Sequence, residues 1–460
     1  MDQRWTLHFR KLGLIEEGSV RIAPLMVFTG DNNSGKSYAM TLLWGVIALG
    51  RDLFPSAVPE SEAYRQCEAW LLARAQEGVD EVVLDGASMD LFVRWFGDNL
   101  NQKKQILCDD LFGKEKIRLK ELRISDYARG KPFVLKWDRQ ALEGSRYSTN
   151  KKGSRRDAFV RFPLLGKESP RSDRYGMIKY LTWNLLMGDL SAPLFPARLS
   201  AESVPGGEIL YLPAARTGFM LMRKVLAATL VSLGKEALPL TLPTRRFVQR
   251  LLNLSFKENG RYGPFADLLE SRIFQGRVRP DGSPLPEYHY SPREKDGAPL
   301  PLWLTSSLVT ELSPLLLFLR SGEDFRSLII EEPEAHLHLK MQMELARLLA
   351  RLVNAGLPVW VTTHGDSFFQ QLSNLVKASA LTQKQLPLVS MDAEESLSPE
   401  QVAAWHFRRS LSPANQERTE VISLAVDEGG IAGAAFNAGL AGLTKETLAL
   451  EELADDGHED

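Results

Sequence analysis

The sequence predicts an α/β protein in which a mixed, largely parallel β-sheet is flanked by helices. Three continuous apolar runs support this prediction, at Leu25–Thr29, Ser327–Ile330 and Leu357–Thr363. Such a run, without polar alternation, is typical of a strand buried on both faces, as in a parallel sheet. Apolar residues with helical spacing follow two of these runs, at 38–49 and 341–352. This order is the one expected of strand–helix units.

Composition places the chain among folded, soluble proteins. The 460 residues are 44% hydrophobic and 25% charged, and the formal net charge is -2. At roughly 150 residues per domain this length predicts two to four domains. Two cysteines, Cys67 and Cys108, are too few for a disulfide framework. The longest apolar stretch, at 38–49, is shorter than the roughly 20 residues of a membrane span, and no secretory signal precedes it. We therefore expect a cytoplasmic protein without a membrane partner.

A glycine-rich loop stands between the first apolar run and the helical segment after it. It fills every position of the G-x-x-x-x-G-K-[ST] motif, which wraps backbone N–H groups around phosphate oxygens at a helix N-terminus. Lys36 would reach the β- and γ-phosphates, and Ser37 would ligate Mg²⁺. The alternative is a Gly/Asn turn that only connects strand to helix. The cofactor-binding residues predicted here are Gly30, Asp31, Asn32, Asn33, Ser34, Gly35, Lys36 and Ser37.

Two adjacent carboxylates end the second apolar run. Ligands of open α/β sheets bind beyond the carboxyl ends of the strands, so Glu331 and Glu332 are expected beside the phosphate loop. One carboxylate would hold the Mg²⁺ and the next would accept a proton from an attacking water. We assign the first role to Glu331 and the second to Glu332. The alternative is a pair of solvated carboxylates at a strand end.

A histidine ends the third apolar run. At that place His364 could hydrogen-bond the γ-phosphate and sense its presence. Taken alone, a histidine is more often a packing or capping residue, and the other two motifs favour the functional interpretation. His336 and His338 raise the alternative of a zinc site, but their spacing is not that of a helical zinc pair. The predicted catalytic residues are Lys36, Glu332 and His364.

The order of these motifs resembles the ABC-type ATPases of the P-loop family. More narrowly, it is similar to AAA-type bacterial ATPases related to the overcoming-lysogenisation-defect nucleases and to RecF-like proteins. The resemblance covers about half of the chain. The passages that carry it are Gly30–Ser37, Leu212–Gly218, Thr305–Leu315, Ile329–His338 and Thr362–Ser367.

The resemblance implies an ATPase head that works as a dimer or higher homo-oligomer, with ATP held between the phosphate loop of one protomer and a signature segment of the other. Ser306 and Ser307 match that segment most nearly. Physically, such a serine pair either caps its own helix or offers hydroxyl and N–H groups to a phosphate in trans. Arg216 is carried over as a nucleotide-sensing or interface arginine, the alternative being a solvated loop arginine.

The sequence departs from the family pattern in several places. The signature segment lacks the L-S-G-G-[QE] form of transporter ATPases. Glu331 stands where Asp is usual, Leu339 where Pro is frequent, and Gly365 where Ser is common. None of these differences removes a catalytic group.

The spacing of the motifs predicts an inserted domain, because Lys36 and Glu331 are 295 residues apart. We expect the first part of the head at 1–50, an α-rich insertion at 51–205, the rest of the head at 206–385 and a C-terminal segment at 386–460. Residues 131–180 hold 13 Lys or Arg against 5 Asp or Glu, which suits nucleic acid or an acidic partner, or a solvated loop. The end of the chain is acidic.

These observations predict an ATP-hydrolysing switch with ATP and Mg²⁺ as cofactors. Standalone ATPases that look like this often belong to bacterial antiphage defence systems, so the expected partner is a separately encoded nuclease or toxin. No D-x-D set follows Leu375, and we expect no built-in nuclease. One alternative is a DNA repair or recombination ATPase that binds DNA through 131–180. Another is an ATP-stabilised scaffold with little turnover.

Overall fold

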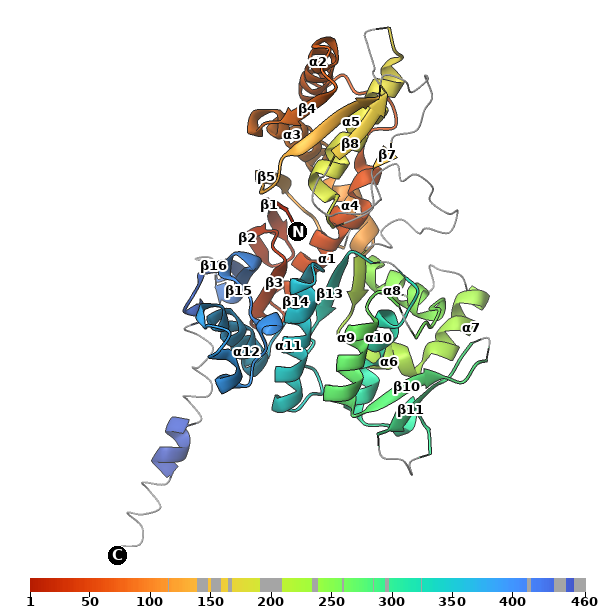
Figure 1. The fold of residues 1–460 in the computed structure, drawn as a ribbon, viewed down its shortest axis with the longest axis vertical. Helices are drawn as coiled ribbons and strands as arrows, with labels where there is room; N and C mark the ends of the chain where they lie inside the picture. Colours follow the sequence, from red (N-terminus) through yellow and green to blue (C-terminus); the bar gives the residue numbers. More distant parts are fainter. Residues whose placement is uncertain are drawn as a thin grey trace, which may run out of the picture.

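Figure 1 shows the fold of the chain in a computed structural model. The structure describes residues 1–114, 116–138, 148–149, 159–163, 168–190, 209–233, 239–258, 260–283, 285–293, 298–323, 325–411, 415–433 and 444–450. Much of the basic region at 131–180, including Lys151, Lys152, Arg155 and Arg156, lies outside the described residues. So does the end of the acidic tail, from 451 onward.

Within the described residues, a nine-stranded sheet forms the centre of the molecule. The five strands from β15 to β9 are parallel to one another, whereas β5, β1 and β2 pair antiparallel, as do β15 and β16. This arrangement confirms the predicted mixed, largely parallel sheet. In spatial order the strands are β5 (Glu121–Arg129), β1 (Gln3–Leu12), β2 (Ile15–Arg21), β16 (Glu417–Leu424), β15 (Val402–Leu411), β3 (Leu25–Gly30), β14 (Val359–Thr362), β13 (Ser327–Glu331) and β9 (Ile209–Leu212).

The three strands predicted from apolar runs lie side by side as β3, β14 and β13. Their registers align Thr362 with both Phe28 and Glu331, so their carboxyl ends meet at one edge of the sheet. Both faces of β3 are buried: Met26 and Phe28 face one core, and Leu25 and Val27 face the other. This two-sided burial explains why the run contains no polar alternation.

Helices cover both faces of the sheet (Figure 1). On one face lies α1 (Lys36–Leu49), which is buried nearly all round. Gly45 lets α4 approach α1, because a Cβ there would lie 2.5 Å from Leu111 Cδ1. Within the described residues, no helix has both the length and the apolar character that a membrane span requires. The helices after β9 are α6 (Arg216–Leu221), α7 (Arg223–Leu233), α8 (Leu242–Leu252), α9 (Gly263–Leu268), α10 (Ser307–Leu319), α11 (Leu339–Asn354) and α12 (Asp366–Lys377).

The inserted segment stands above β1 and β5 in Figure 1. As predicted, most of its described secondary structure is helical, but it also contains a four-stranded sheet and supplies β5 to the head. Where burial is described, buried residues alternate with more exposed ones along these strands, so they contain no continuous apolar run that would have identified them. The elements are α2 (Glu62–Gln76), α3 (Gly86–Gln102), α4 (Lys104–Phe112) and α5 (Arg171–Met187), with β4 (Glu81–Leu84), β6 (Phe133–Asp138), β7 (Ser148–Thr149) and β8 (Phe159–Pro163).

The expected boundary of the head at 385 needs correction. Strand β15 pairs with β3 in the middle of the sheet, and β16 continues it toward β2, so these two strands of the segment expected at 386–460 belong to the sheet of the head. Besides the four-stranded sheet of the insertion, two small sheets of the described residues lie outside the main one. Their strands are β10 (Gly276–Pro280), β11 (Tyr288–Pro292) and β12 (Leu300–Pro301), and β17 (Val426–Asp427) with β18 (Gly430–Ile431).

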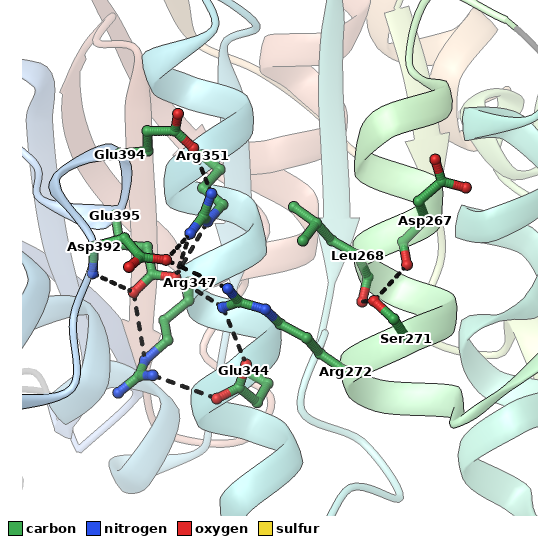
Figure 2. Close-up of polar contacts among 10 residues, drawn as sticks. All are labelled: Asp267, Leu268, Ser271, Arg272, Glu344, Arg347, Arg351, Asp392, Glu394 and Glu395. Atoms are coloured by element: carbon green, nitrogen blue, oxygen red, sulfur yellow. Dashed lines mark hydrogen bonds and ion pairs between the residues drawn. The ribbon is translucent and has the colours of Figure 1, made fainter.

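A network of ion pairs holds the segment that leads into β15. Figure 2 shows Arg347 and Arg351 extending from α11 toward Asp392, Glu394 and Glu395. Arg272 reaches Glu395 from the π-helical turn that follows α9, with an Nη1–Oε1 distance of 3.0 Å. The side chain of Glu395 is 1% exposed. The adjacent cavity has room for about one water molecule, so it is no ligand site.

Candidate nucleotide site

The phosphate loop runs from the end of β3 into α1 in a conformation that needs its glycines. Gly30 has φ of +121°, and a Cβ there would lie 2.2 Å from the backbone oxygen of Phe407 on β15. Gly35 precedes the helix with φ of +89°. The Asp31 carboxylate accepts a hydrogen bond from the Arg409 N–H at 2.7 Å. Strand β15, which was not predicted from the sequence, thus contacts the phosphate loop through Phe407 and Arg409.

The ammonium group of Lys36 folds over its own loop. Its Nζ donates to the carbonyl oxygens of Gly30 at 2.8 Å and Asp31 at 2.7 Å. The side chain is almost fully buried, and desolvation lowers the pKa of Lys36 to about 8 against the opposing charges of Glu332, Asp31 and Glu334. A phosphate oxygen would restore a strong anionic partner to this cation.

Glu331 lies buried at the end of β13, beside the start of α1. Burial raises the pKa of the Glu331 carboxyl, and hydrogen bonds from the hydroxyl groups of Ser37 and Tyr211 oppose this rise. Its Oε2 accepts a weak hydrogen bond from the Ala214 N–H at 3.4 Å, whereas its buried Oε1 has no hydrogen-bond partner among the described residues. A buried, unsatisfied carboxylate oxygen next to a serine hydroxyl fits Mg²⁺, which prefers hard oxygen ligands.

Glu332 and His364 lie in contact next to Lys36. The Nε2 atom of His364 is 3.3 Å from Oε1 of Glu332, and its Nδ1 atom is 3.2 Å from Nζ of Lys36. Because an ammonium group only donates, Nδ1 accepts and the ring proton is on Nε2, pointing at the carboxylate. The structure therefore brings all three predicted catalytic residues together at one sheet edge. Both His364 and Glu332 keep about a third of their side-chain surface exposed, so a ligand can reach them.

Glu334 is a residue of this edge that the sequence analysis did not single out. Its Oε1 accepts three hydrogen bonds from the loop after β14: the Thr363 hydroxyl at 2.6 Å, the His364 N–H at 2.8 Å and the Gly365 N–H at 2.9 Å. A Cβ at Gly365 would lie 2.8 Å from Cγ of Glu334. The glycine at 365 thus makes room for the carboxylate that fixes the backbone of His364.

The two predicted signature serines lie at the start of α10. Ser306 is the N-cap residue, yet its side chain makes no capping hydrogen bond, and both Ser306 and Ser307 are exposed. Trp303 and Leu304, just before them, expose 67% and 55% of their surface. Among the described contacts, no hydrogen bond or ion pair joins either serine to the phosphate loop of the same chain. Their hydroxyl groups are available to a partner.

The structure excludes one of the two alternatives that the sequence left open for Arg216. Arg216 is 1% exposed, so the interpretation as a solvated loop arginine is wrong. Its guanidinium group contacts carbonyl oxygens of this chain and the carboxylate of Glu311 on α10. Burial lowers the pKa of Arg216, and the charge of Glu311 opposes this shift.

No three His, Cys, Asp or Glu side chains of the described residues cluster as metal ligands.

Comparison with protein families adds one match. Residues 249–368 match the model of an AAA ATPase domain. This range includes the serines at the start of α10, the two glutamates at 331 and 332, and His364, but not the phosphate loop. This match supports a P-loop ATPase. No curated protein matches the chain.

Solved structures give remote similarities at 10% sequence identity. The SMC head domain from Thermotoga maritima aligns over 92% of this chain and 99% of its own, with a TM-score of 0.32. An Smc head domain from Pyrococcus furiosus with an extended coiled coil, bound to the C-terminal domain of ScpA, aligns over 98% of both chains with a TM-score of 0.33. An SmcHead bound to the C-winged helix domain of ScpA gives 0.35 over 91% and 97%. Similarity at this level carries no information about activity or partners.

Proposed function

We propose that this chain binds ATP with Mg²⁺, hydrolyses it, and acts as a nucleotide-dependent switch that dimerises and controls a separate effector protein. The contact chain from Lys36 through His364 to Glu332, beside a complete phosphate loop, carries the proposal. The proposal is supported by the grouping of a cation, a hydrogen-bond donor and a carboxylate, since hydrolysis of a γ-phosphate by water needs these three kinds of group.

The residues have distinct tasks in this proposal. Lys36 leaves the loop carbonyls to bind phosphate oxygens, and the Nε2–H of His364 is donated to the γ-phosphate. Glu332 accepts a proton as the water oxygen bonds to the γ-phosphorus and the bond to the β–γ bridging oxygen breaks. Ser37 and Glu331 hold Mg²⁺, which neutralises phosphate charge when it is bound.

A comparison of two glutamine variants tests the assignment of the base. Glu332→Gln keeps the shape of the side chain and its hydrogen-bond contact but cannot take up the proton, so we expect ATP binding with hydrolysis slowed at least 100-fold. Glu428→Gln, at an exposed glutamate in the turn between β17 and β18, is the matched control. Equal hydrolysis rates in the two variants would remove Glu332 from the role.

Dimerisation is proposed from the exposed start of α10. Large exposed apolar residues such as Trp303 and Leu304 mark interaction surfaces, and they flank serines whose hydroxyl groups lack a capping bond. ATP held by Glu332→Gln should therefore shift the chain from monomer to dimer in sedimentation velocity. A monomer at saturating ATP contradicts this part of the proposal.

The effector and the defence role rest on the family resemblance alone. Affinity purification from the native host should recover a nuclease or toxin with Glu332→Gln in the presence of ATP, and release it with Lys36→Ala. Recovery of DNA and repair factors instead would favour the repair ATPase. That second candidate is supported by the net charge of +8 in 131–180, and it predicts salt-dependent DNA binding that is lost when Lys151, Lys152, Arg155 and Arg156 are neutralised.

A further inference from the structure

Arg216 makes an unusually complete set of contacts for a residue outside the nucleotide site. Its Nη1 donates to the Glu331 carbonyl oxygen at 2.6 Å and to that of Pro213 at 3.2 Å. Its Nη2 donates to the Glu332 carbonyl oxygen at 3.0 Å. Its Nε donates to the Glu311 carbonyl oxygen at 3.2 Å, and Nη2 lies 2.8 Å from the carboxylate of Glu311. One guanidinium group thus spans the end of β13, the end of β9 and helix α10.

The carbonyl group held by Nη2 belongs to a strained residue. Glu332 has φ of +45°, a left-handed conformation that is uncommon for residues with a side chain. Such conformations persist where the surroundings hold them, and they gather at functional sites. Here the N–H of Glu332 is bonded to the Thr362 carbonyl oxygen at 2.8 Å, and its carbonyl oxygen is bonded to Arg216. The peptide groups on both sides of its Cα are therefore fixed.

The direction of the Glu332 side chain follows from this backbone conformation. If φ relaxed to a negative value, the Cβ would turn away from its present position and the carboxylate would lose its 3.3 Å contact with His364. Arg216 also holds the carbonyl group of Glu331, so it fixes the two consecutive residues that carry the acidic side chains of the site.

The ion pair with Glu311 alone does not account for this geometry. Glu311 is 1% exposed and also accepts a hydrogen bond from the hydroxyl group of Thr217. A buried ion pair adds little net stability compared with apolar residues of similar size, because both charges lose their hydration. Three backbone carbonyl oxygens from two strand ends need the planar fork of an arginine, which a lysine cannot supply.

We propose that Arg216 is a positioning residue for hydrolysis: its guanidinium fork holds Glu332 in the left-handed conformation that aims the general base. The proposal rests on the proposed ATPase function and names the residue that sets the geometry of its base. It contrasts with the nucleotide-sensing role, since Arg216 acts through the backbone of Glu332 and does not touch the nucleotide.

Two full-length variants separate positioning from stability. Arg216→Lys keeps a charge beside Glu311 but loses the fork, so kcat should fall at least tenfold while KM for ATP changes less than threefold. Glu311→Gln keeps the fork on Glu331 and Glu332 but removes the counter-charge of a buried cation. It should lower the unfolding midpoint more than Arg216→Lys does, yet keep kcat within about threefold of wild type. If the variant with the lower unfolding midpoint also has the lower kcat, the effect on kcat is a loss of stability and the proposal is overturned.

Hydrogen exchange provides a readout that does not depend on turnover. In Arg216→Lys the amides of Glu332, Glu334 and Ala335 should exchange at least tenfold faster than in wild type, with the central strands unchanged. Unchanged exchange there refutes the positioning role even where kcat falls. A wild-type chain that hydrolyses no ATP refutes the proposed function, and the exchange comparison still decides whether Arg216 holds Glu332.

Discussion

The buried ammonium group of Lys36 makes nucleotide affinity depend on pH in a predictable direction. Without nucleotide its pKa is about 8, because burial disfavours the charged form. A bound triphosphate favours the charged form and raises this pKa. The affinity for nucleotide is therefore highest below pH 8 and falls as the pH rises above 8, because Lys36 must then take up a proton when the nucleotide binds.

The size of the effect follows from the two protonation states. With a pKa of about 8, about nine-tenths of the free protein carries the charge at pH 7 and about one-tenth at pH 9. If the bound form stays charged, the affinity for Mg²⁺–ATP falls about tenfold over this range, or about 1.4 kcal/mol. The phosphate groups of ATP are already ionised there, because their last pKa lies near 6.

Titration calorimetry with Glu332→Gln measures this prediction without turnover. At pH 8.5, titrations in buffers of different ionisation enthalpy should reveal the uptake of a fraction of a proton per nucleotide bound. Lys36→Arg is the control, because arginine stays charged and the remaining affinity should not change between pH 7 and 9. If the protein that retains Lys36 shows the same affinity at pH 7 and pH 9 and takes up no proton, burial does not lower the pKa of Lys36 as described.

Three further outcomes follow from the contacts described. Glu334→Ala removes the acceptor of three hydrogen bonds that hold the loop of His364, so we expect kcat to fall about 10- to 100-fold with intact nucleotide binding, measured by phosphate release and fluorescent-nucleotide titration. Trp303→Glu places a charge on the exposed approach to α10 and should abolish the ATP-dependent dimer in sedimentation velocity without changing ATP affinity. Glu395→Gln neutralises the buried acceptor shared by Arg272 and Arg351, and chemical denaturation should show a loss of about 3 kcal/mol, with an unchanged midpoint refuting the network's role.

The sequence was most informative where a strand is buried on both faces and ends in a polar motif. The runs that became β3, β14 and β13 could be recognised locally, and parallel pairing then brings their ends together. This is why Lys36, Glu332 and His364 could be expected at one place before their contacts were known. The chemical roles of the three residues remain predictions.

Features that depend on distant pairing could not be predicted in the same way. Strand β15 lies beside β3 although some 370 residues separate them in the chain, and nothing local in 402–411 specifies that partner. The same limit applies to Arg216, whose carbonyl partners come from two strand ends and a helix. Glu334 carried a usable signal, because it follows the acidic pair by two residues at the same sheet edge.

We propose that Lys36, His364 and Glu332 together catalyse the hydrolysis of ATP. The most direct measurement is phosphate release from ATP by the purified chain with Mg²⁺, compared with the same chain carrying Lys36→Ala. Phosphate release by wild type should saturate with ATP, and release by the variant should fall to background. Equal release from both proteins, or none from wild type, would contradict it.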